Sequence, residues 1–326
     1  MAAPPKEFEF PFVENYDVQD ASFFRQGKEL PTPDEVRARA AGAGYKSRGK
    51  LLLRPPLLRY RSLGLAVKFG NHVSIAEAHC LMFLGKHAPT VPVPELFGWR
   101  RDKRQTFIYM KYVDGFTASR FAGVLYSPAV ERPLNTIHVQ VMAVIEALKR
   151  IPQSLVTPVP FVGESRSRWI QCFKGLVSVC SQPGHVNGTH LQDWAIINSA
   201  TPVSEAGPFP SVAAFHDWFA YKYGRPSSCD LPAEMYEQYR SLLPDDSTVT
   251  LAHGGLTLDN LIVSQPVPGG TVTLQAVVDW SQAGWYPSYW DNYKLIYANN
   301  NAEDDGVADP QGVVDAYTFF TLNAST

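Results

Sequence analysis

The stretch His253-Gly254-Gly255-Leu256-Thr257-Leu258-Asp259-Asn260 decides how this chain is interpreted. It leads directly into a short apolar run, and a second apolar run, after a turn rich in Pro and Gly, ends at Asp279. Two such runs joined by a turn are typical of a hairpin, which would bring the Asn260 amide close to the Asp279 carboxylate. Because Mg²⁺ prefers oxygen ligands of this kind, we predict a metal site formed by Asn260 and Asp279.

A cation in the first third of the chain adds to this set. Lys68 lies in the otherwise apolar run Leu65-Ala66-Val67-Lys68-Phe69, so its ammonium requires a partner. The next segment has apolar residues at helical spacing, and Glu77 on that helix would supply the partner. A strand Lys with a helix Glu is often only a surface pair, and Asn260 or Asp279 alone could form an Asx turn or cap a strand. All four in this order instead predict a site that neutralises phosphates and holds a metal, as phosphoryl transfer from ATP requires.

The composition limits the class of protein and its partners. The chain has 326 residues, of which 45% are hydrophobic and 18% charged, and its net charge is -2. This allows a large core and predicts no nucleic-acid partner and no attraction to an anionic membrane. No stretch reaches the roughly 20 apolar residues that cross a bilayer, and the start lacks a signal-type apolar core. Four cysteines without a CxxC pair are typical of a reduced protein, so we expect a cytoplasmic location.

The periodicity of apolar residues predicts an α+β fold. The first third reads as strand, strand, helix, strand, strand, and aromatic residues before it are expected to pack as an N-terminal arm. A helix precedes the strands, with Thr32 as its cap, Pro33 as its first residue and Glu35 completing a capping box. The part after Asp114-Gly115 is mainly helical until short strands return. The expected strands are 57–60, 63–69, 94–99, 105–110, 248–251, 261–263 and 275–278, and the expected helices are 73–85, 136–151, 212–223, 233–243 and 288–298.

Together these segments resemble the aminoglycoside phosphotransferase and choline kinase superfamily, which has a protein-kinase-like fold. Within it, the chain is most similar to fungal phosphotransferase-family proteins. The resemblance covers nearly the whole chain, and its parts are specific only in combination. They are Val67-Lys68, Glu77-Ala78, Val91-Pro92-Val93-Pro94, Ile108 through Gly115, His253 through Asn260, Val278-Asp279-Trp280 and Ala283 through Pro287.

The resemblance implies a two-lobed fold with ATP and Mg²⁺ in the cleft between the lobes. A smaller β-rich lobe with the N-terminal arm would comprise residues 1–110, and a mostly helical lobe would comprise residues 111–326. The substrate would be a small molecule. The site roles that the resemblance implies are Lys68 on the phosphates with Glu77 as its partner, Tyr109, Met110 and Tyr112 at the hinge behind the adenine, Asn260 and Asp279 on Mg²⁺, and His253 as a brace of the catalytic loop.

Three features depart from the pattern of that superfamily. Gly255 stands where the catalytic Asp is expected, Lys111 stands in the hinge where an acidic residue is common, and no GxGxxG loop precedes Lys68. The missing loop matters little, because the superfamily often lacks a regular one. A positioned general base contributes roughly 10²–10⁴ in rate, but phosphoryl transfer depends mostly on positioning and charge neutralisation. Asp259 could substitute for the missing base, although as the neighbour of Asn260 it is expected to point elsewhere.

Three functions stay open from the sequence. The first is ATP-dependent phosphoryl transfer to a small-molecule hydroxyl, which the retained cation, amide and carboxylates favour. The second is a pseudokinase that binds without catalysis, and the third is an enzyme that reuses the pocket for other chemistry in secondary metabolism; Gly255 favours both. No GxSxG elbow or dinucleotide fingerprint offers another activity. If aromatic residues of the C-terminal half line a cleft, an apolar substrate is favoured, but we expect most of them in the core. They are Trp169, Trp194, Phe209, Phe215 and Trp218.

Overall fold

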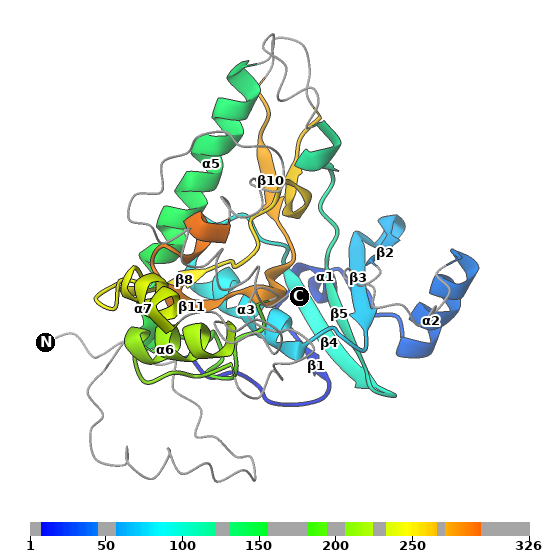
Figure 1. Ribbon diagram of the computed structural model, residues 1–326. Helices are drawn as coiled ribbons and strands as arrows, with labels where there is room; N and C mark the ends of the chain where they lie inside the picture. Colours follow the sequence, from blue (N-terminus) through cyan, green and yellow to red (C-terminus); the bar gives the residue numbers. More distant parts are fainter. Residues whose placement is uncertain are drawn as a thin grey trace, which may run out of the picture. The chain divides into compact units, whose positions relative to one another are not determined.

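The computed structural model describes seven ranges of the chain: 8–44, 57–121, 131–155, 182–193, 206–223, 233–265 and 271–294 (Figure 1). The chain divides into two compact units. Unit 1 combines Met1–Glu9, Leu148–Leu256 and Gln282–Thr326, and unit 2 combines Phe10–Ala147 and Thr257–Ser281. The lobe boundary expected after residue 110 is a different division of the chain, and it stays a prediction.

The main sheet of unit 2 has five antiparallel strands in the order β1-β4-β5-β3-β2. The strands are β1 (Tyr16–Asp17), β2 (Leu57–Tyr60), β3 (Leu65–Gly70), β4 (Leu96–Asp102) and β5 (Gln105–Lys111). β3 and β5 lie inside the sheet and are buried on both faces, which explains their nearly continuous apolar runs. The four strands expected in this part of the chain are confirmed. β1 was not predicted, because two residues are too few to show a period.

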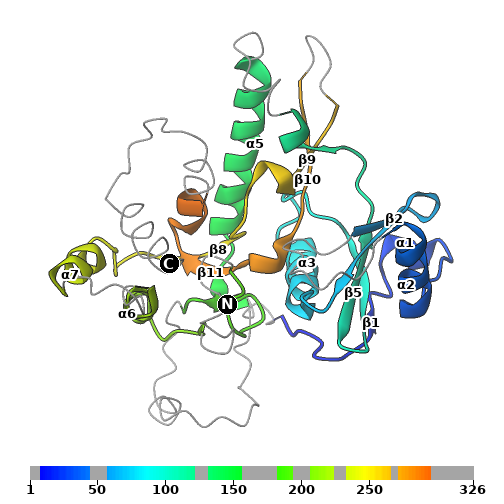
Figure 2. The same ribbon diagram turned by 45° about the vertical axis from the view of Figure 1, so that its right-hand side comes forward.

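The two faces of this sheet carry different helices (Figure 2). One face packs against α1 (Ser22–Arg25) and α2 (Pro33–Gly42), and the other packs against α3 (Ile75–His87). Because side chains alternate along a strand, the Lys68 side chain points to the α3 face. The side chains of its two neighbours in the chain, Val67 and Phe69, point to the core on the opposite face. That core includes Phe23, Val36, Val67, Phe69, Phe107 and Tyr109.

Both α2 and α3 begin at polar caps. α2 has the predicted capping box: the Glu35 N–H donates to Thr32 Oγ1 at 3.3 Å, and the Thr32 N–H donates to the Glu35 carboxylate at 2.7 Å. α3 begins after Ser74, whose Oγ accepts from the Ala76 N–H at 3.2 Å. Caps of this kind satisfy N–H groups that have no partner within the helix. The cap therefore fixes the first turn of α3, which holds Glu77.

An aromatic arm at the start of unit 2 covers α3. The rings of Phe10 and Phe12 lie 5.1 and 5.2 Å from the His79 ring, and the Trp99 ring lies 5.2 Å from it. His79 Nε2 donates to the Pro11 carbonyl oxygen at 3.1 Å. Burial lowers the pKa of His79 to about 4, which this bond opposes only in part, so the ring is neutral at neutral pH. The predicted packing of the N-terminal aromatic residues is confirmed.

A second sheet of unit 2 contains the hairpin predicted near the C-terminal end. Its strands follow the order β10-β9-β6, and the register pairs Leu261 with Val277. The Gln140 side chain of α5 (Glu131–Lys149) accepts from the β10 backbone at 2.8 Å. The hairpin is confirmed, and its turn at 266–270 lies outside the described residues. The strands are β6 (Phe116–Thr117), β9 (Leu261–Val263) and β10 (Leu274–Val277).

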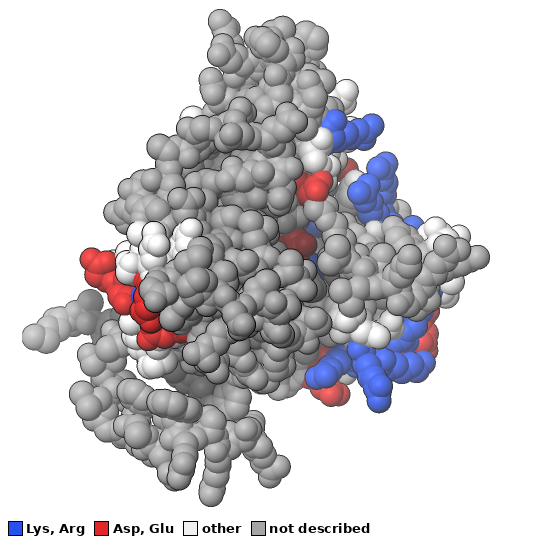
Figure 3. Space-filling view, viewed as in Figure 1, with Lys and Arg blue, Asp and Glu red and all other residues white. Residues whose placement is uncertain are grey.

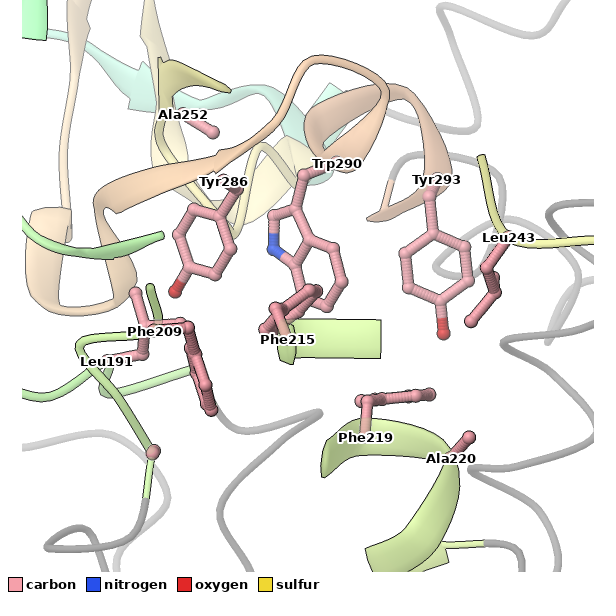
Figure 4. Close-up of a cluster of buried hydrophobic side chains, with 11 residues drawn as sticks. Leu191, Phe209, Phe215, Phe219, Ala220, Leu243, Ala252, Tyr286, Trp290 and Tyr293 are labelled. Atoms are coloured by element: carbon pink, nitrogen blue, oxygen red, sulfur yellow. The ribbon is translucent and has the colours of Figure 1, made fainter. Parts of the chain in front are cut away.

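Unit 1 contains a small sheet in the order β7-β11-β8 and an aromatic core (Figure 4). Phe209 and Phe215 lie in this core and Trp218 packs against it, as expected for three of the five aromatic residues considered; Trp169 and Trp194 lie outside the described residues. The elements of unit 1 are β7 (Gly184–His185), α6 (Val212–Tyr223), α7 (Ala233–Ser241), β8 (Val249–Ala252) and β11 (Gly284–Pro287).

The combination of sheets and helices confirms the predicted α+β class. The helices expected at 136–151, 212–223 and 233–243 are observed as α5, α6 and α7. Residues 290–294 are also helical, and the remainder of the helix expected there lies outside the described part of the chain. Among the helices that the structure describes, none has both the length and the apolar character needed to span a membrane.

Candidate functional site

The structure brings Lys68 together with two carboxylates inside unit 2. Its Nζ donates to Glu77 Oε1 and Oε2 at 2.9 and 2.7 Å, and to Asp279 Oδ1 at 2.7 Å. Lys68 comes from β3, Glu77 from the first turn of α3, and Asp279 from the residues that follow β10. Lys68 is 7% exposed and Glu77 is 2% exposed, so their ion pair is buried and is not a surface pair.

The charges of this triad keep Lys68 protonated. Burial by itself would lower the pKa of Lys68, but the charges of Glu77 and Asp279 outweigh burial and raise that pKa above its ordinary value. Burial raises the pKa of the Glu77 carboxyl; Asp279 acts in the same direction, and Lys68 opposes both. With all three groups ionised, the triad carries one excess negative charge. That excess favours a further cation beside Asp279.

Asp279 is held in an uncommon backbone conformation. Its φ is 63°, in the left-handed region that residues other than glycine rarely adopt. The residues around it fix this geometry: the buried Trp280 donates its Nε1–H to the Val277 carbonyl at 2.9 Å, and Ser281 Oγ donates to Asp279 Oδ1 at 2.7 Å. Conformations of this kind persist where the surrounding structure over-determines them, and they cluster at functional sites. Asp279 is therefore a firmly positioned carboxylate.

Asn260 lies beside Asp279 at the same end of the hairpin. It ends the single-turn helix η7 (Leu258–Asn260), and its N–H donates to the Thr257 carbonyl at 2.9 Å. Its own carbonyl accepts from the Val278 N–H at 2.9 Å. This bond joins the residue before β9 to the residue before Asp279, so the backbone brings the predicted amide and carboxylate into neighbouring positions.

Asp259 is engaged with a different partner. Its carboxylate accepts a hydrogen bond from the Ser119 hydroxyl on η2 (Ala118–Phe121). Ser119 Oγ also lies 3.2 Å from Thr117 Oγ1. The bond to Ser119 ties Asp259 to the segment after β6, which agrees with the expectation that this neighbour of Asn260 points elsewhere.

The oxygen donors present fit a magnesium ion that is shared with phosphates. Within the described ranges, no cluster of three or more His, Cys, Asp or Glu side chains could hold a metal by itself. Mg²⁺, however, commonly takes one or two protein oxygens and completes its octahedral shell with phosphates and water. Asn260 and Asp279 offer such a pair, next to a triad with excess negative charge.

The predicted hinge residues do not all lie on one side of the main sheet. The register pairs Ala66 with Met110 and Val67 with Tyr109. Residues opposite each other in a ladder share a face, so Met110 lies on the Lys68 face, whereas Tyr109 lies in the core on the α2 face. Burial raises the pKa of the Tyr109 phenol well above its ordinary range. The structure therefore separates the Tyr109 side chain from Lys68.

The backbone after β5 is bonded within unit 2. The Lys111 N–H donates to the Glu95 carbonyl at 2.8 Å, and the Tyr112 N–H donates to the Gly64 carbonyl at 2.9 Å. The second bond ties Tyr112 to the connection between β2 and β3. These two backbone donors of the predicted hinge are therefore already used by the fold.

The loop His253-Gly254-Gly255 belongs to unit 1 and is held there by a buried carboxylate. The His253 N–H donates to Asp291 Oδ2 at 3.0 Å, and the Gly254 N–H donates to Asp291 Oδ1 at 2.8 Å. The Gly255 N–H donates to His253 Nδ1 at 3.1 Å, so this nitrogen accepts and the ring proton lies on Nε2. His253 is completely buried, so it braces the loop from within unit 1.

Gly254 is a position that only glycine can occupy without strain. Its φ is 73°, and an added Cβ would lie 2.7 Å from the Gln282 carbonyl oxygen and 3.1 Å from Asp193 Oδ2. Left-handed backbone is costly for residues with a Cβ, and the first distance is too short for one. The loop therefore packs directly against the backbone that precedes β11.

Two buried carboxylates near this loop were not predicted. Burial raises the pKa of Asp291 to about 6, although its two backbone hydrogen bonds oppose the shift. Asp193, also buried, accepts from Trp290 Nε1 at 2.9 Å and from Lys294 Nζ at 2.6 Å. The sequence signal was weak for both, because Asp193 lies in no helix or strand, and an Asp in an aromatic helical segment, like Asp291, can equally lie on the solvent side.

A comparison with family models shows which family this chain belongs to. A family model described as the phosphotransferase enzyme family matches residues 73–322. A crystal structure of an aminoglycoside-3'-phosphotransferase of type VIII is similar at a TM-score of 0.40 and 13% identity, covering 87% of this chain and 97% of that one. The aminoglycoside phosphotransferase APH(3'')-Id from Streptomyces rimosus ATCC10970 is similar at a TM-score of 0.43 and 13% identity, covering 91% of this chain and 93% of that one. No curated protein matches the chain. Because the family model extends from the start of α3 past the hairpin that holds Asp279, the chain belongs to the phosphotransferase enzyme family.

Proposed function

We propose that this protein transfers the γ-phosphoryl group of ATP, together with Mg²⁺, to a hydroxyl group of a small molecule. One observation carries the proposal: Lys68 lies buried between Glu77 and Asp279, with N–O distances of 2.7 to 2.9 Å. Removing charges from water is costly, so stability alone gives little reason to assemble this triad. Membership of the phosphotransferase enzyme family supports phosphoryl transfer as the reaction class.

Each residue of unit 2 would have a separate task. Lys68 would donate to the phosphates while Glu77 keeps its ammonium in place. Asp279 would exchange its bond from Lys68 for a place beside the metal, with Asn260 as the second oxygen ligand. The bound Mg²⁺ would supply neutralisation of phosphate charge. Glu77 has no direct part in the chemistry and serves to orient Lys68.

Gly255 offers no side chain to orient or deprotonate the acceptor. Losing a positioned base costs roughly 10²–10⁴ in rate, which phosphoryl transfer can tolerate because it relies mainly on positioning and charge neutralisation. Asp259, bonded to Ser119, does not replace the base. We therefore propose a slow enzyme, or one whose acceptor hydroxyl is acidic enough to need no strong base.

A binding protein without catalysis is the second candidate function, and Gly255 is the observation that favours it. In that case Lys68 and Asp279 would hold a nucleotide without turnover. Reuse of the site for other chemistry in secondary metabolism is a third proposal, on the same observation. A cytoplasmic location and an apolar acceptor remain predictions from composition.

Nucleotide binding can be tested by thermal unfolding of the full chain. A ligand at about 100 times its Kd stabilises by about 2.7 kcal/mol, so Mg²⁺-ATP should raise the melting temperature. Lys68→Met and Asp279→Asn should each remove most of that increase. Lys103→Met, at an exposed Lys that pairs with Asp34 at 3.3 Å, is the matched control and should respond to Mg²⁺-ATP like the wild type. Absence of any increase at millimolar nucleotide would exclude phosphoryl transfer from ATP.

Restoring the carboxylate separates the candidate functions. Gly255→Asp should raise ATP hydrolysis or phosphoryl transfer at least tenfold if the other groups are in place, since a base contributes roughly 10²–10⁴. A wild type that binds Mg²⁺-ATP, with neither form showing turnover, would favour the binding protein. Conversion of a substrate by the wild type without nucleotide, lost in Gly255→Asp, would favour the third proposal.

A further inference from the structure

The cations at the surface of the main sheet fall into two groups. In the first group, near β1, β4 and the β4–β5 turn, three members form ion pairs with carboxylates, from Arg37 to Asp34 and Asp102, from Arg100 to Asp17 and from Lys103 to Asp34. The second group lies around β2 and the connection between β2 and β3. No Asp or Glu of the described residues forms an ion pair with any member of this group, which consists of Lys28, Arg39, Arg59, Arg61 and Lys111.

Members of the second group meet backbone and aromatic groups in place of carboxylates. Arg39 Nη2 donates to the Arg59 carbonyl at 3.0 Å, and Lys28 Nζ donates to the Leu63 carbonyl at 3.1 Å. A neutral carbonyl satisfies a donor but does not cancel the positive charge. The space-filling view shows Lys and Arg side chains at the edge of unit 2 where β2 lies in Figure 1 (Figure 3). Clustered like charges repel, so an anion bound at this edge would reduce the electrostatic repulsion between these side chains.

Two arginines of the group lie on one aromatic ring. The Cζ atoms of Arg59 and Arg61 are each 5.9 Å from the centre of the Tyr112 ring, so they are at most twice that distance apart. Tyr112 is in turn tied to the β2–β3 connection through the Gly64 carbonyl at 2.9 Å. The two guanidinium groups are thus held near each other by a ring that the backbone fixes, and both are exposed.

Arg59 shares the sheet face of Lys68. The register pairs Leu57 with Lys68 and Arg59 with Ala66, and paired residues project to the same side. The alternate residues of β2 point to the opposite core, as Leu58 does. Two residues along a strand span about 7 Å and neighbouring strands lie about 4.8 Å apart, so a small molecule with its phosphates at Lys68 can reach Arg59.

We propose that Arg59 and Arg61 form a second anion site, the β2 rim, which holds a carboxylate or phosphate group of a small molecule bound beside Lys68. The inference rests on the proposed function only for what lies at the Lys68 end. Guanidinium groups suit both oxyanions because they donate two parallel hydrogen bonds. A small molecule fits the rim better than a nucleic acid, since the chain carries a net charge of -2 and offers no general attraction to a polyanion.

Titration calorimetry of the full chain with tripolyphosphate and with citrate tests the rim. The double variant Arg59→Gln/Arg61→Gln should weaken binding of at least one probe by tenfold or more. The control variant Arg101→Gln/Arg104→Gln removes the same charge from the exposed β4–β5 turn, and it should change the affinity for either probe less than twofold. Loss confined to the tripolyphosphate arm identifies a phosphate group, and loss in the citrate arm identifies a carboxylate. An equal loss of probe affinity in both double variants, or no loss of affinity in either, would overturn the proposal.

A further variant separates this inference from the proposed function. If Lys68→Met abolishes probe binding and Arg59→Gln/Arg61→Gln leaves it intact, the rim is wrong while the Lys68 site stands. If the rim variant loses probe binding and Lys68→Met retains it, the rim stands even where Mg²⁺-ATP does not bind. Vesicles of three parts phosphatidylcholine to one part phosphatidylserine form the last arm. Binding to them, lost in the rim variant, without binding of either soluble probe, would overturn the small-molecule assignment.

Discussion

Removing the Lys68 ammonium should destabilise unit 2 strongly. Lys68→Met keeps most of the apolar stem but takes away the cation that Glu77 contacts at 2.7 and 2.9 Å. Glu77 is 2% exposed, so water cannot replace the lost partner. Removing one member of a buried ion pair costs about 3–5 kcal/mol. At about 2–4 °C per kcal/mol for large domains, the melting temperature should fall by roughly 6–20 °C.

The size of this effect should depend on pH. In Lys68→Met the carboxyl groups of Glu77 and Asp279 face each other without a cation, so the pKa of Glu77, already raised by burial, rises further. A carboxyl whose pKa is higher in the folded than in the unfolded state binds its proton more tightly when folded. The stability of the variant therefore falls as pH rises above the ordinary value of 4.5. The difference in unfolding free energy between Lys68→Met and the wild type should therefore become smaller as the pH is lowered from about 8 to about 5.

Two further variants make the reasoning refutable. Lys103→Met, at a side chain that is 69% exposed, should change stability by no more than about 0.5 kcal/mol. Lys68→Met/Glu77→Gln removes the uncompensated charge together with the cation and should recover about 1–3 kcal/mol of the loss. Thermal and urea unfolding give both numbers. A loss in Lys68→Met no larger than in Lys103→Met would show that burial of the Glu77 charge does not depend on this ion pair.

Further predictions concern the loop of unit 1 and the response to acid. Gly254→Ala should cost about 2–4 kcal/mol of unfolding free energy, because strain of about 1–2 kcal/mol in left-handed backbone adds to the clash. Gly27→Ala, at φ 67° with nothing within 4 Å of an added Cβ, should cost only the strain, and equal losses in urea unfolding would contradict the packing argument. Burial lowers the pKa of His79, and of His216, which is completely buried on α6, to about 4, below the ordinary 6.5, so unfolding takes up protons and stability falls as pH drops through this window. Each imidazole ring contributes up to about 3 kcal/mol to this loss of unfolding free energy in acid, and Asp291, whose pKa is raised to about 6, offsets a similar amount. His216→Gln should therefore flatten the dependence of unfolding free energy on pH, and an unchanged dependence would refute the lowered pKa of His216.

Local patterns predicted much of unit 2 and part of its site. The capping box of Thr32 and Glu35, the strands around Lys68 and the hairpin between Asn260 and Asp279 all follow from signals within a few residues of each other. Such signals suffice because turn chemistry, capping and apolar period are local properties of the chain. The same reasoning also predicted Glu77 as the partner of Lys68, and the structure shows that pair; the phosphate and metal roles of the site residues stay predictions.

Which groups meet was decided only by the tertiary structure. β5 is apolar on both faces, so its sequence could not show that Met110 shares the face of Lys68 while Tyr109 lies in the opposite core. Asp291 and Asp193 give no pattern of their own, because a buried carboxylate is defined by partners far away in the chain. Likewise, that no carboxylate of the described residues pairs with Arg59 is a property of the folded sheet. Sequence determined the elements and the residue types available to them, and long-range packing determined which side chains share a face, lose water and acquire partners.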